Sequence, residues 1–187
     1  MRLAPLFEKY GTDKLAHGYA DFYEVLLGRW REDIKTLLEI GIGTMIPGAW
    51  SSMVGFGGPG YRPGGSLRAW RDWMTNAEIY GLDTQLDCMI TDEPRITTIL
   101  GNSCDHNAAA AFGTFDVIID DGSHSYTDQM ATFRAQWPLL RSGGLYVIED
   151  LTSQEMLNNW RELRHAAGGS PLFFVGPANQ AVVVAKV

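Results

Sequence analysis

Phe115-Asp116-Val117-Ile118-Ile119-Asp120-Asp121 is the stretch that decides the fold, because a short, strongly apolar run ends there in two carboxylates. A second run, Leu145-Tyr146-Val147-Ile148-Glu149-Asp150, ends in the same way. Short runs rich in β-branched residues are typical of strands that are buried on both faces. The two runs therefore predict neighbouring strands of a buried, parallel sheet.

The acids at the ends of these strands predict a ligand site. A carboxylate at the tip of a buried strand is costly to desolvate unless a cation, a hydrogen-bond donor or water meets it. Ligands of open α/β sheets bind at the carboxyl ends of the strands. Asp121, Glu149 and Asp150 therefore suggest a site for a hard metal ion with oxygen ligands, of which Mg²⁺ is the expected one. His124 places an imidazole beside that site.

Strands and helices alternate along the rest of the chain. Strands are expected at residues 35–40, 78–83 and 95–100, helices at 66–74, 108–112, 127–140 and 153–167, a turn at 142–144, and a closing β-hairpin at 171–176 and 180–187. This alternation predicts an α/β, doubly wound sheet that is mostly parallel and carries a C-terminal antiparallel hairpin.

The length of 187 residues fits a single domain that spans residues 1–187. Residues 1–31 are expected to form a helical N-terminal cap or lid. Residues 44–65 are rich in Gly and Pro and lack periodicity, which predicts a long loop. Long loops inside compact domains commonly carry function, so this one is expected to contact the substrate.

Composition excludes several classes of partner. The formal net charge of −7 argues against nucleic acid or an anionic membrane as the main partner. The two cysteines lack metal-ligand spacing and favour a reduced, cytoplasmic compartment. No apolar run approaches the length of a signal sequence or a membrane span.

A glycine turn follows the first predicted strand. Gly41 and Gly43 would allow a ligand to approach the backbone closely. The dinucleotide-binding pattern requires a third glycine where this chain has Ile46, which disfavours a pyrophosphate ligand and an NAD-dependent oxidoreductase. Asp83, at the end of the second strand, could accept two hydrogen bonds from a ribose diol or cap the following helix, and both roles remain open.

The order of these motifs resembles that of class I S-adenosylmethionine-dependent methyltransferases. The resemblance is carried by residues 39–43, 81–83, 101–103 and 115–121. Within this class, the chain is most similar to the metal-dependent sugar O-methyltransferases of macrolide (mycinamicin-type) biosynthesis. The segments that carry this narrower resemblance are Tyr10-Gly11-Thr12-Asp13-Lys14, His17-Gly18-Tyr19, residues 65–70, Asp120-Asp121-Gly122-Ser123-His124 and Ile148-Glu149-Asp150-Leu151. The similarity covers nearly the whole chain.

The resemblance implies a role for each candidate residue. Glu39, Gly41 and Gly43 would face the methionine part of the cofactor. Asp83 would contact the ribose, and Asn102 and Ser103 would border the adenine. Lys14, Tyr19 and Asp120 would also lie on the cofactor side, where the alternation of side chains along the strand places Asp120. Asp121, Glu149 and Asp150 match the metal ligands of the family, and His124 matches its general base.

The implied reaction is chemically consistent. A sulfonium transfers its methyl group by in-line displacement, and the protein supplies orientation and electrostatics. Bound Mg²⁺ lowers the pKa of an acceptor hydroxyl, and a histidine takes the proton near neutral pH. We therefore expect an O-methyltransferase that acts on a hydroxyl of a sugar or sugar-bearing small molecule, with a homo-oligomer as one candidate assembly. A catechol-type phenol as acceptor and a non-catalytic cofactor-binding module remain as alternatives.

Overall fold

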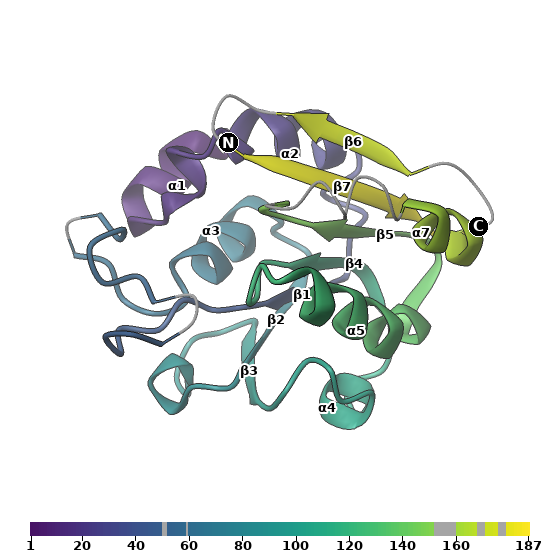
Figure 1. Ribbon diagram of the computed structural model, residues 1–187. Coiled ribbons are helices and arrows are strands. Elements are labelled where there is room, and N and C mark those ends of the chain that lie inside the picture. Colours follow the sequence, from purple (N-terminus) through teal and green to yellow (C-terminus); the bar gives the residue numbers. More distant parts are fainter. Residues whose placement is uncertain (50–51, 59, 152–159, 168–170, 176–178) are drawn as a thin grey trace.

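The computed structural model describes residues 1–49, 52–58, 60–151, 160–167, 171–175 and 179–187. Within these residues one mixed sheet crosses the molecule in the strand order β3-β2-β1-β4-β5-β7-β6 (Figure 1). The strands are β1 (Thr36–Ile40), β2 (Glu78–Asp83), β3 (Ile96–Leu100), β4 (Phe115–Asp120), β5 (Leu140–Ile148), β6 (Leu172–Val175) and β7 (Gln180–Ala185).

The strand directions define where a ligand can bind. Strands β1 to β5 all run parallel to one another. At the other end of the sheet, β7 is antiparallel to β5, and β6 is antiparallel to β7. The chain passes from β1 outward to β2 and β3 and then crosses back to β4, so the strand order reverses between β1 and β4. Ligands of open α/β sheets bind at the carboxyl ends of the strands at such a reversal. The predicted doubly wound sheet with an antiparallel C-terminal hairpin is confirmed.

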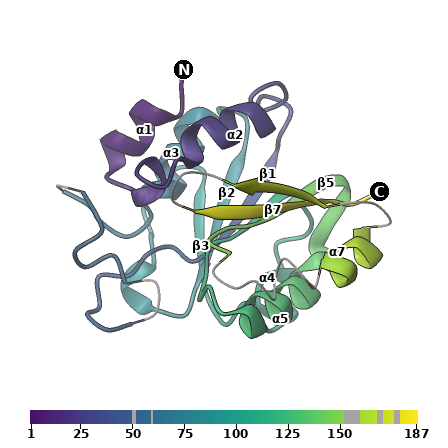
Figure 2. The same ribbon diagram turned by 45° about the horizontal axis from the view of Figure 1, so that its top comes forward.

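Helices cover both faces of the sheet (Figures 1 and 2). The helices α1 (Ala4–Tyr10), α2 (Tyr19–Leu27) and α3 (Gly65–Trp73) lie on one face, and α4 (Asn107–Ala110), α5 (Tyr126–Gln136) and α7 (Trp160–Ala167) lie on the other. Three short 3₁₀ turns lie in the connections: η1 (Asp13–Leu15) between α1 and α2, η2 (Leu86–Cys88) between β2 and β3, and η3 (Trp137–Leu139) between α5 and β5. Among the described residues, no helix combines the length and the apolar character that crossing a membrane requires.

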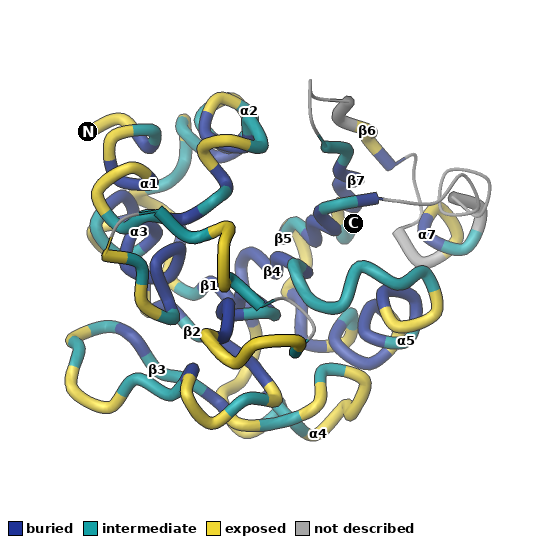
Figure 3. The backbone as a smooth tube through the Cα atoms, turned by 60° about the vertical axis from the view of Figure 1, so that its left-hand side comes forward, coloured by how far each residue is buried: buried dark blue, intermediate teal, exposed yellow. Residues whose placement is uncertain are grey.

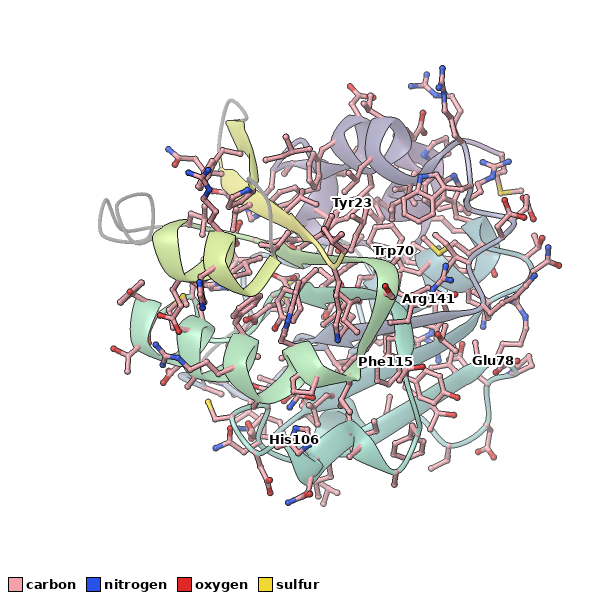
Figure 4. All side chains as sticks on the ribbon, turned by 90° about the vertical axis from the view of Figure 1, so that its right-hand side faces the viewer. Tyr23, Trp70, Glu78, His106, Phe115 and Arg141 are labelled. Carbon is pink, nitrogen blue, oxygen red and sulfur yellow. The ribbon has the colours of Figure 1, made fainter. Side chains whose placement is uncertain are left out.

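The core has two layers because side chains of a strand alternate between faces. Val117 and Ile119 of β4 pack with α1, α2 and α3, whereas Phe115 and Ile118 pack with α4, α5 and α7. Figure 3 shows the central strands buried and the connecting loops largely exposed. Aromatic side chains fill the first layer: Figure 4 labels Tyr23 and Trp70, whose ring centroids are 4.9 Å apart.

The N-terminal segment is helical and is divided into α1 and α2, with η1 between them. Gly11 ends α1 with φ of 67°, and Gly18 precedes α2 with φ of 79°. Left-handed backbone of this kind is open to glycine at little cost and breaks a helix. The break places η1, with Lys14, over the carboxyl ends of the strands instead of on a continuous helix.

Two boundaries differ from the expectation. The predicted turn at 142–144 is wrong, because β5 runs through it. The register of β4 and β5 shifts between Phe115 and Val117, and the extra residues of β5 form a bulge. The helix expected to reach residue 140 ends at Gln136, where Pro138 enters η3. The hairpin of β6 and β7 is confirmed. Residues 176–178, in the stretch where its turn was expected, and 152–159, where the last helix was expected to begin, lie outside the described residues.

Candidate active site

The turn after β1 brings two strand ends into contact. Gly41 has φ of +87°, and a Cβ atom there would lie 2.0 Å from the backbone oxygen of Asp121. The backbone NH of Asp121 donates to the backbone carbonyl of Ile40 at 2.9 Å, and the backbone NH of Glu149 donates to the backbone carbonyl of Asp120 at 2.9 Å. The ends of β1, β4 and β5 are thus aligned, and glycine at position 41 is what permits their close approach.

Three side chains converge at this edge. Ligand atoms of Asp121, His124 and Asp150 all lie within 4.8 Å of one another, and each side chain is partly buried. His124 and Asp150 adopt left-handed backbone, with φ of 58° and 52°. Non-glycine residues in this region are uncommon and concentrate at functional sites. Two carboxylates and one imidazole form a donor set that suits a divalent cation.

Asp150 is oriented by further contacts. Its Oδ1 accepts hydrogen bonds from the hydroxyl of Tyr19 at 2.7 Å and from Nδ2 of Asn179 at 2.6 Å. Its backbone NH donates to the hydroxyl of Tyr19 at 3.0 Å. Burial raises the pKa of Tyr19 above its ordinary value, and the charges of Glu149 and Asp150 act in the same direction. The phenol therefore stays protonated and donates to the carboxylate.

Glu149 is not part of this group. Its side chain is 1% exposed, and its carboxylate accepts hydrogen bonds from Nζ of Lys14 at 2.5 Å and from the hydroxyl of Tyr23. Burial raises the pKa of Glu149, which the charge of Lys14 opposes. The structure thus brings Asp121 and Asp150 together with His124, and it does not bring the side chain of Glu149 into that group. A metal-ligand role for Glu149 stays a prediction.

Lys14 is a buried cation between three acids. Its Nζ lies 2.6 Å from Asp121, 2.5 Å from Glu149 and 3.3 Å from Glu39, and its side chain is 2% exposed. Burial alone would lower the pKa of Lys14, but the three carboxylates raise it well above its usual value. The ammonium group of Lys14 is therefore charged, although it is buried.

Glu39 belongs to the same buried network. Its Oε2 accepts hydrogen bonds from Oγ of Ser66 at 2.7 Å and from Nε1 of Trp70 at 3.2 Å. Burial raises the pKa of Glu39, which Lys14 opposes. Its side chain lines neither of the two cavities described next, so the expected contact of Glu39 with a cofactor also stays a prediction.

A cavity of ≈ 550 Å³ opens above the carboxyl ends of the strands. Its walls include Asp121, His124 and Asp150, the turn residues Gly41 and Gly43, Asp13 and His17 of the N-terminal segment, and Met53, Phe56 and Tyr61 of the 44–65 loop. The cavity thus has an acidic edge and an apolar wall. The loop and the N-terminal segment both contribute to it, while their roles as a substrate loop and a lid stay predictions.

A second cavity of ≈ 300 Å³ adjoins the first, and Gly41 lines both. It is lined by Asp83, Asn102, Ser103, Asp120, Gln129 and Thr132, among others. Asp83 accepts backbone hydrogen bonds from Ile42 at 2.8 Å and Gln85 at 2.9 Å. Burial raises the pKa of Asp120 to about 8. Asp120 lines this second cavity, whereas Asp121 lines the first. Successive side chains at a strand end point to opposite sides, which explains the difference.

Several residues of the site were not predicted from the sequence. Asp13 and Tyr61 line the larger cavity, and Tyr23 binds Glu149. The hydroxyl of Tyr61 donates to the carbonyl of Gly43 at 2.9 Å, which fixes the loop against the glycine turn. Composition indicated the loop but not where it folds back, because this contact joins residues 18 positions apart without any periodic pattern.

The fold and the site resemble those of class I methyltransferases: a mostly parallel sheet with a glycine turn after β1, an acid at the end of β2, and cavities that share Gly41 where the strand order reverses. A family model described as a methyltransferase domain matches residues 64–151.

Named relatives narrow the similarity. The chain is 37% identical over 155 residues to demethylmacrocin O-methyltransferase of Streptomyces fradiae, and 36% identical over 155 residues to mycinamicin VI 2''-O-methyltransferase of Micromonospora griseorubida. Each match covers 80% of this chain and 36% of the relative, so the chain spans about a third of the length of these relatives. The chain therefore resembles sugar O-methyltransferases of macrolide pathways.

A solved structure supports the same grouping. The MycE methyltransferase of the mycinamycin biosynthetic pathway, in complex with Mg and SAH, matches with a TM-score of 0.75 and 29% identity. The match covers 100% of this chain and 55% of that chain. A second MycE structure with Mg, SAH and mycinamycin VI matches with the same TM-score of 0.75.

Proposed function

We propose that this chain is a methyltransferase domain that uses S-adenosylmethionine and Mg²⁺ to methylate a hydroxyl of a sugar or a sugar-bearing small molecule. One observation carries the proposal: Asp121, His124 and Asp150 converge on the wall of the larger cavity, which meets the second cavity at Gly41. The proposed acceptor class rests on the relatives, two of which are named as O-methyltransferases of a rhamnosyl tetracenomycin C.

The cofactor is proposed to span the two cavities. Its nucleoside would occupy the smaller one, where Asp83, Asn102 and Ser103 present polar atoms. Its methionine part would pass Gly41, which lines both cavities. Asp83 holds Ile42 and Gln85 through one hydrogen bond to each carboxylate oxygen, and each oxygen retains acceptor capacity for a ribose hydroxyl.

The residues present fit a divalent cation. Asp121 and Asp150 supply oxygen ligands and His124 supplies a nitrogen within the 4.8 Å group. Carboxylates are the ligands that Mg²⁺ prefers, so Asp121 and Asp150 would hold it, joined by Glu149 if that side chain turns from Lys14. A bound Mg²⁺ lowers the pKa of an acceptor hydroxyl and fixes its position.

His124 is proposed to take the proton of the acceptor hydroxyl. Its Nε2 lies 3.8 Å from Oδ2 of Asp150, on the wall of the cavity where the acceptor would bind. The side chain is 29% exposed, so a ligand in the cavity can reach it. Proton removal by a positioned histidine contributes about 10²–10⁴-fold to rate in enzymes generally.

Methyl transfer from labelled S-adenosylmethionine to a deoxysugar glycoside, assayed with Mg²⁺, tests this function. We expect Asp121→Asn and Asp150→Asn to lose at least about 10²-fold in activity, because each removes a charge needed by the metal. Asp21→Asn is the matched control, since Asp21 lies exposed on α2 in a surface ion pair with Arg2. Full activity of both site variants would reject the proposed site.

A further inference from the structure

Lys14 joins three strand ends through one ammonium group. Glu39 belongs to β1, Asp121 follows β4 and Glu149 follows β5, and all three carboxylates lie within 3.3 Å of Nζ. The lysine comes from η1, 107 residues before Asp121 and 135 before Glu149. The N-terminal segment is thus held to the site by a buried ion-pair cluster.

One ammonium serves three acid side chains in this cluster, which lies beside the acids of the candidate metal site. The hydroxyls of Tyr23 and Ser66 donate to Glu149 and Glu39 but carry no charge. A lysine ammonium is a compact point charge, and it meets the same carboxylate oxygens that a metal ion would meet.

Asp121 is shared between two groups. Its Oδ2 accepts a hydrogen bond from Lys14 at 2.6 Å, and its carboxylate also belongs to the group formed with His124 and Asp150. Lys14 additionally occupies the carboxylate of Glu149, which the sequence predicts as a metal ligand. A cation that binds Asp121 therefore lies close to the ammonium, and one that also binds Glu149 has to replace it there.

We propose that Lys14 is a built-in competitor of the divalent cation. The ammonium holds Asp121 and Glu149 while the metal is absent, which stabilises the clustered acids, and it weakens metal binding by like-charge repulsion and by occupying shared oxygens. This inference rests on the metal site of the proposed function. It gives Lys14 a second role besides tethering the N-terminal segment, because it sets the affinity of the site for the metal.

Metal affinity measured without cofactor or substrate tests the inference. Mn²⁺ binding to the full chain is followed by electron paramagnetic resonance of the free ion, which needs no catalysis. Lys14→Met keeps the apolar stem and removes the charge, so we expect Mn²⁺ to bind at least about tenfold more tightly, as removal of a nearby like charge at intermediate dielectric implies. Lys14→Arg, the matched control, keeps the charge and should stay within about threefold of the parent chain.

A purely structural role for Lys14 predicts a different result. Lys14→Met would then unfold more easily while its Mn²⁺ affinity equals that of the parent chain, and this outcome overturns the inference. Asp150→Asn separates the two proposals, because Asp150 belongs to the metal group and not to the Lys14 ion pairs. Asp150→Asn should weaken Mn²⁺ binding both in the parent chain and in the Lys14→Met variant. Absence of Mn²⁺ binding in the parent chain and in Lys14→Met rejects the metal site together with the competition.

A measurement on the parent chain covers the case in which Lys14→Met fails to fold. Nitrogen-15 NMR of lysine ammonium groups detects those that exchange slowly with water, as a buried, hydrogen-bonded Lys14 should, and Lys14→Arg identifies the signal by its loss. Addition of Mg²⁺ should shift or erase this signal over the same concentration range in which Mn²⁺ binds. An unchanged signal at saturating Mg²⁺ overturns the inference.

Discussion

Nε2 of His124 lies 3.8 Å from Oδ2 of Asp150, and both residues hold a left-handed backbone at the mouth of the larger cavity. Such conformations cost about 1–3 kcal/mol and persist where the surrounding structure imposes them. Asp150 is fixed by the hydroxyl of Tyr19 and by Asn179. The pair therefore places an imidazole beside a carboxylate whose position is set by other residues.

His124→Ala should abolish methyl transfer while cofactor binding stays intact. We expect kcat to fall about 10²–10⁴-fold, because the proton acceptor is lost. The affinity for S-adenosylhomocysteine, measured by calorimetry, should stay within about threefold, since His124 lines the larger cavity and not the proposed nucleoside cavity. The exposed His165 of α7 provides the control His165→Ala, which should keep full activity. Turnover by His124→Ala at the parental rate would remove His124 from the reaction.

Gly41→Ala should disrupt both stability and cofactor binding. The new Cβ would lie 2.0 Å from the backbone oxygen of Asp121, and the φ of +87° is strained for alanine. Gly55→Ala is a matched control, because Gly55 has the same φ of +87° but no atom within 4 Å of the new Cβ. We expect a loss of about 1–2 kcal/mol at Gly55 from backbone strain, and at least about 2 kcal/mol more at Gly41 from overpacking. Equal losses in urea denaturation would contradict the close approach.

Tyr23→Phe should destabilise the folded chain, because it removes a hydrogen bond to the buried carboxylate of Glu149. The hydroxyl of Tyr23 donates to a buried carboxylate, and its removal leaves that oxygen without this partner at a cost of about 1–3 kcal/mol. Tyr146→Phe is the control, because its buried hydroxyl has no hydrogen-bond partner among the described residues. Chemical denaturation should separate the two variants, and an equal stability of both would argue against the role of Tyr23.

Asp120→Asn should flatten the dependence of stability on pH. Burial raises the pKa of Asp120 to about 8 from an ordinary value of 3.8. Between these values the folded chain keeps the proton and the unfolded chain releases it, so the free energy of unfolding falls as pH rises, by at most about 1.4 kcal/mol per pH unit. Asparagine does not titrate, so the variant should lose this part of the slope in urea denaturation from pH 5 to 8. A slope identical to that of the parent chain would show that Asp120 is ionised in the folded state.

Strand positions could be predicted because they depend on local pattern. The apolar runs before Asp120 and before Glu149 end at β4 and β5 as expected, since burial on both faces leaves a continuous signal in the sequence. The turn at 142–144 was wrong because the bulge of β5 depends on pairing with β4, which no local pattern encodes.

Side-chain directions at the site depended on distant partners. Glu149 turns to Lys14 and Tyr23, which lie 135 and 126 residues before it. The position of a carboxylate at a strand end could be predicted, but the cation that meets it could not, because Lys14 reaches the site only after Gly11 and Gly18 divide the N-terminal helices. The grouping of Asp121 with Asp150 followed from the adjacency of β4 and β5.

The central claim is that a divalent cation held by the strand-end acids enables methyl transfer to a sugar hydroxyl. The most direct measurement follows methyl transfer from labelled S-adenosylmethionine to a deoxysugar glycoside and, in parallel, to a catechol, with excess chelator and after re-addition of Mg²⁺. We expect methylated glycoside with Mg²⁺, none in chelator, and recovery on re-addition. Full turnover in chelator would contradict the role of the metal, and methylation of the catechol alone would contradict the acceptor.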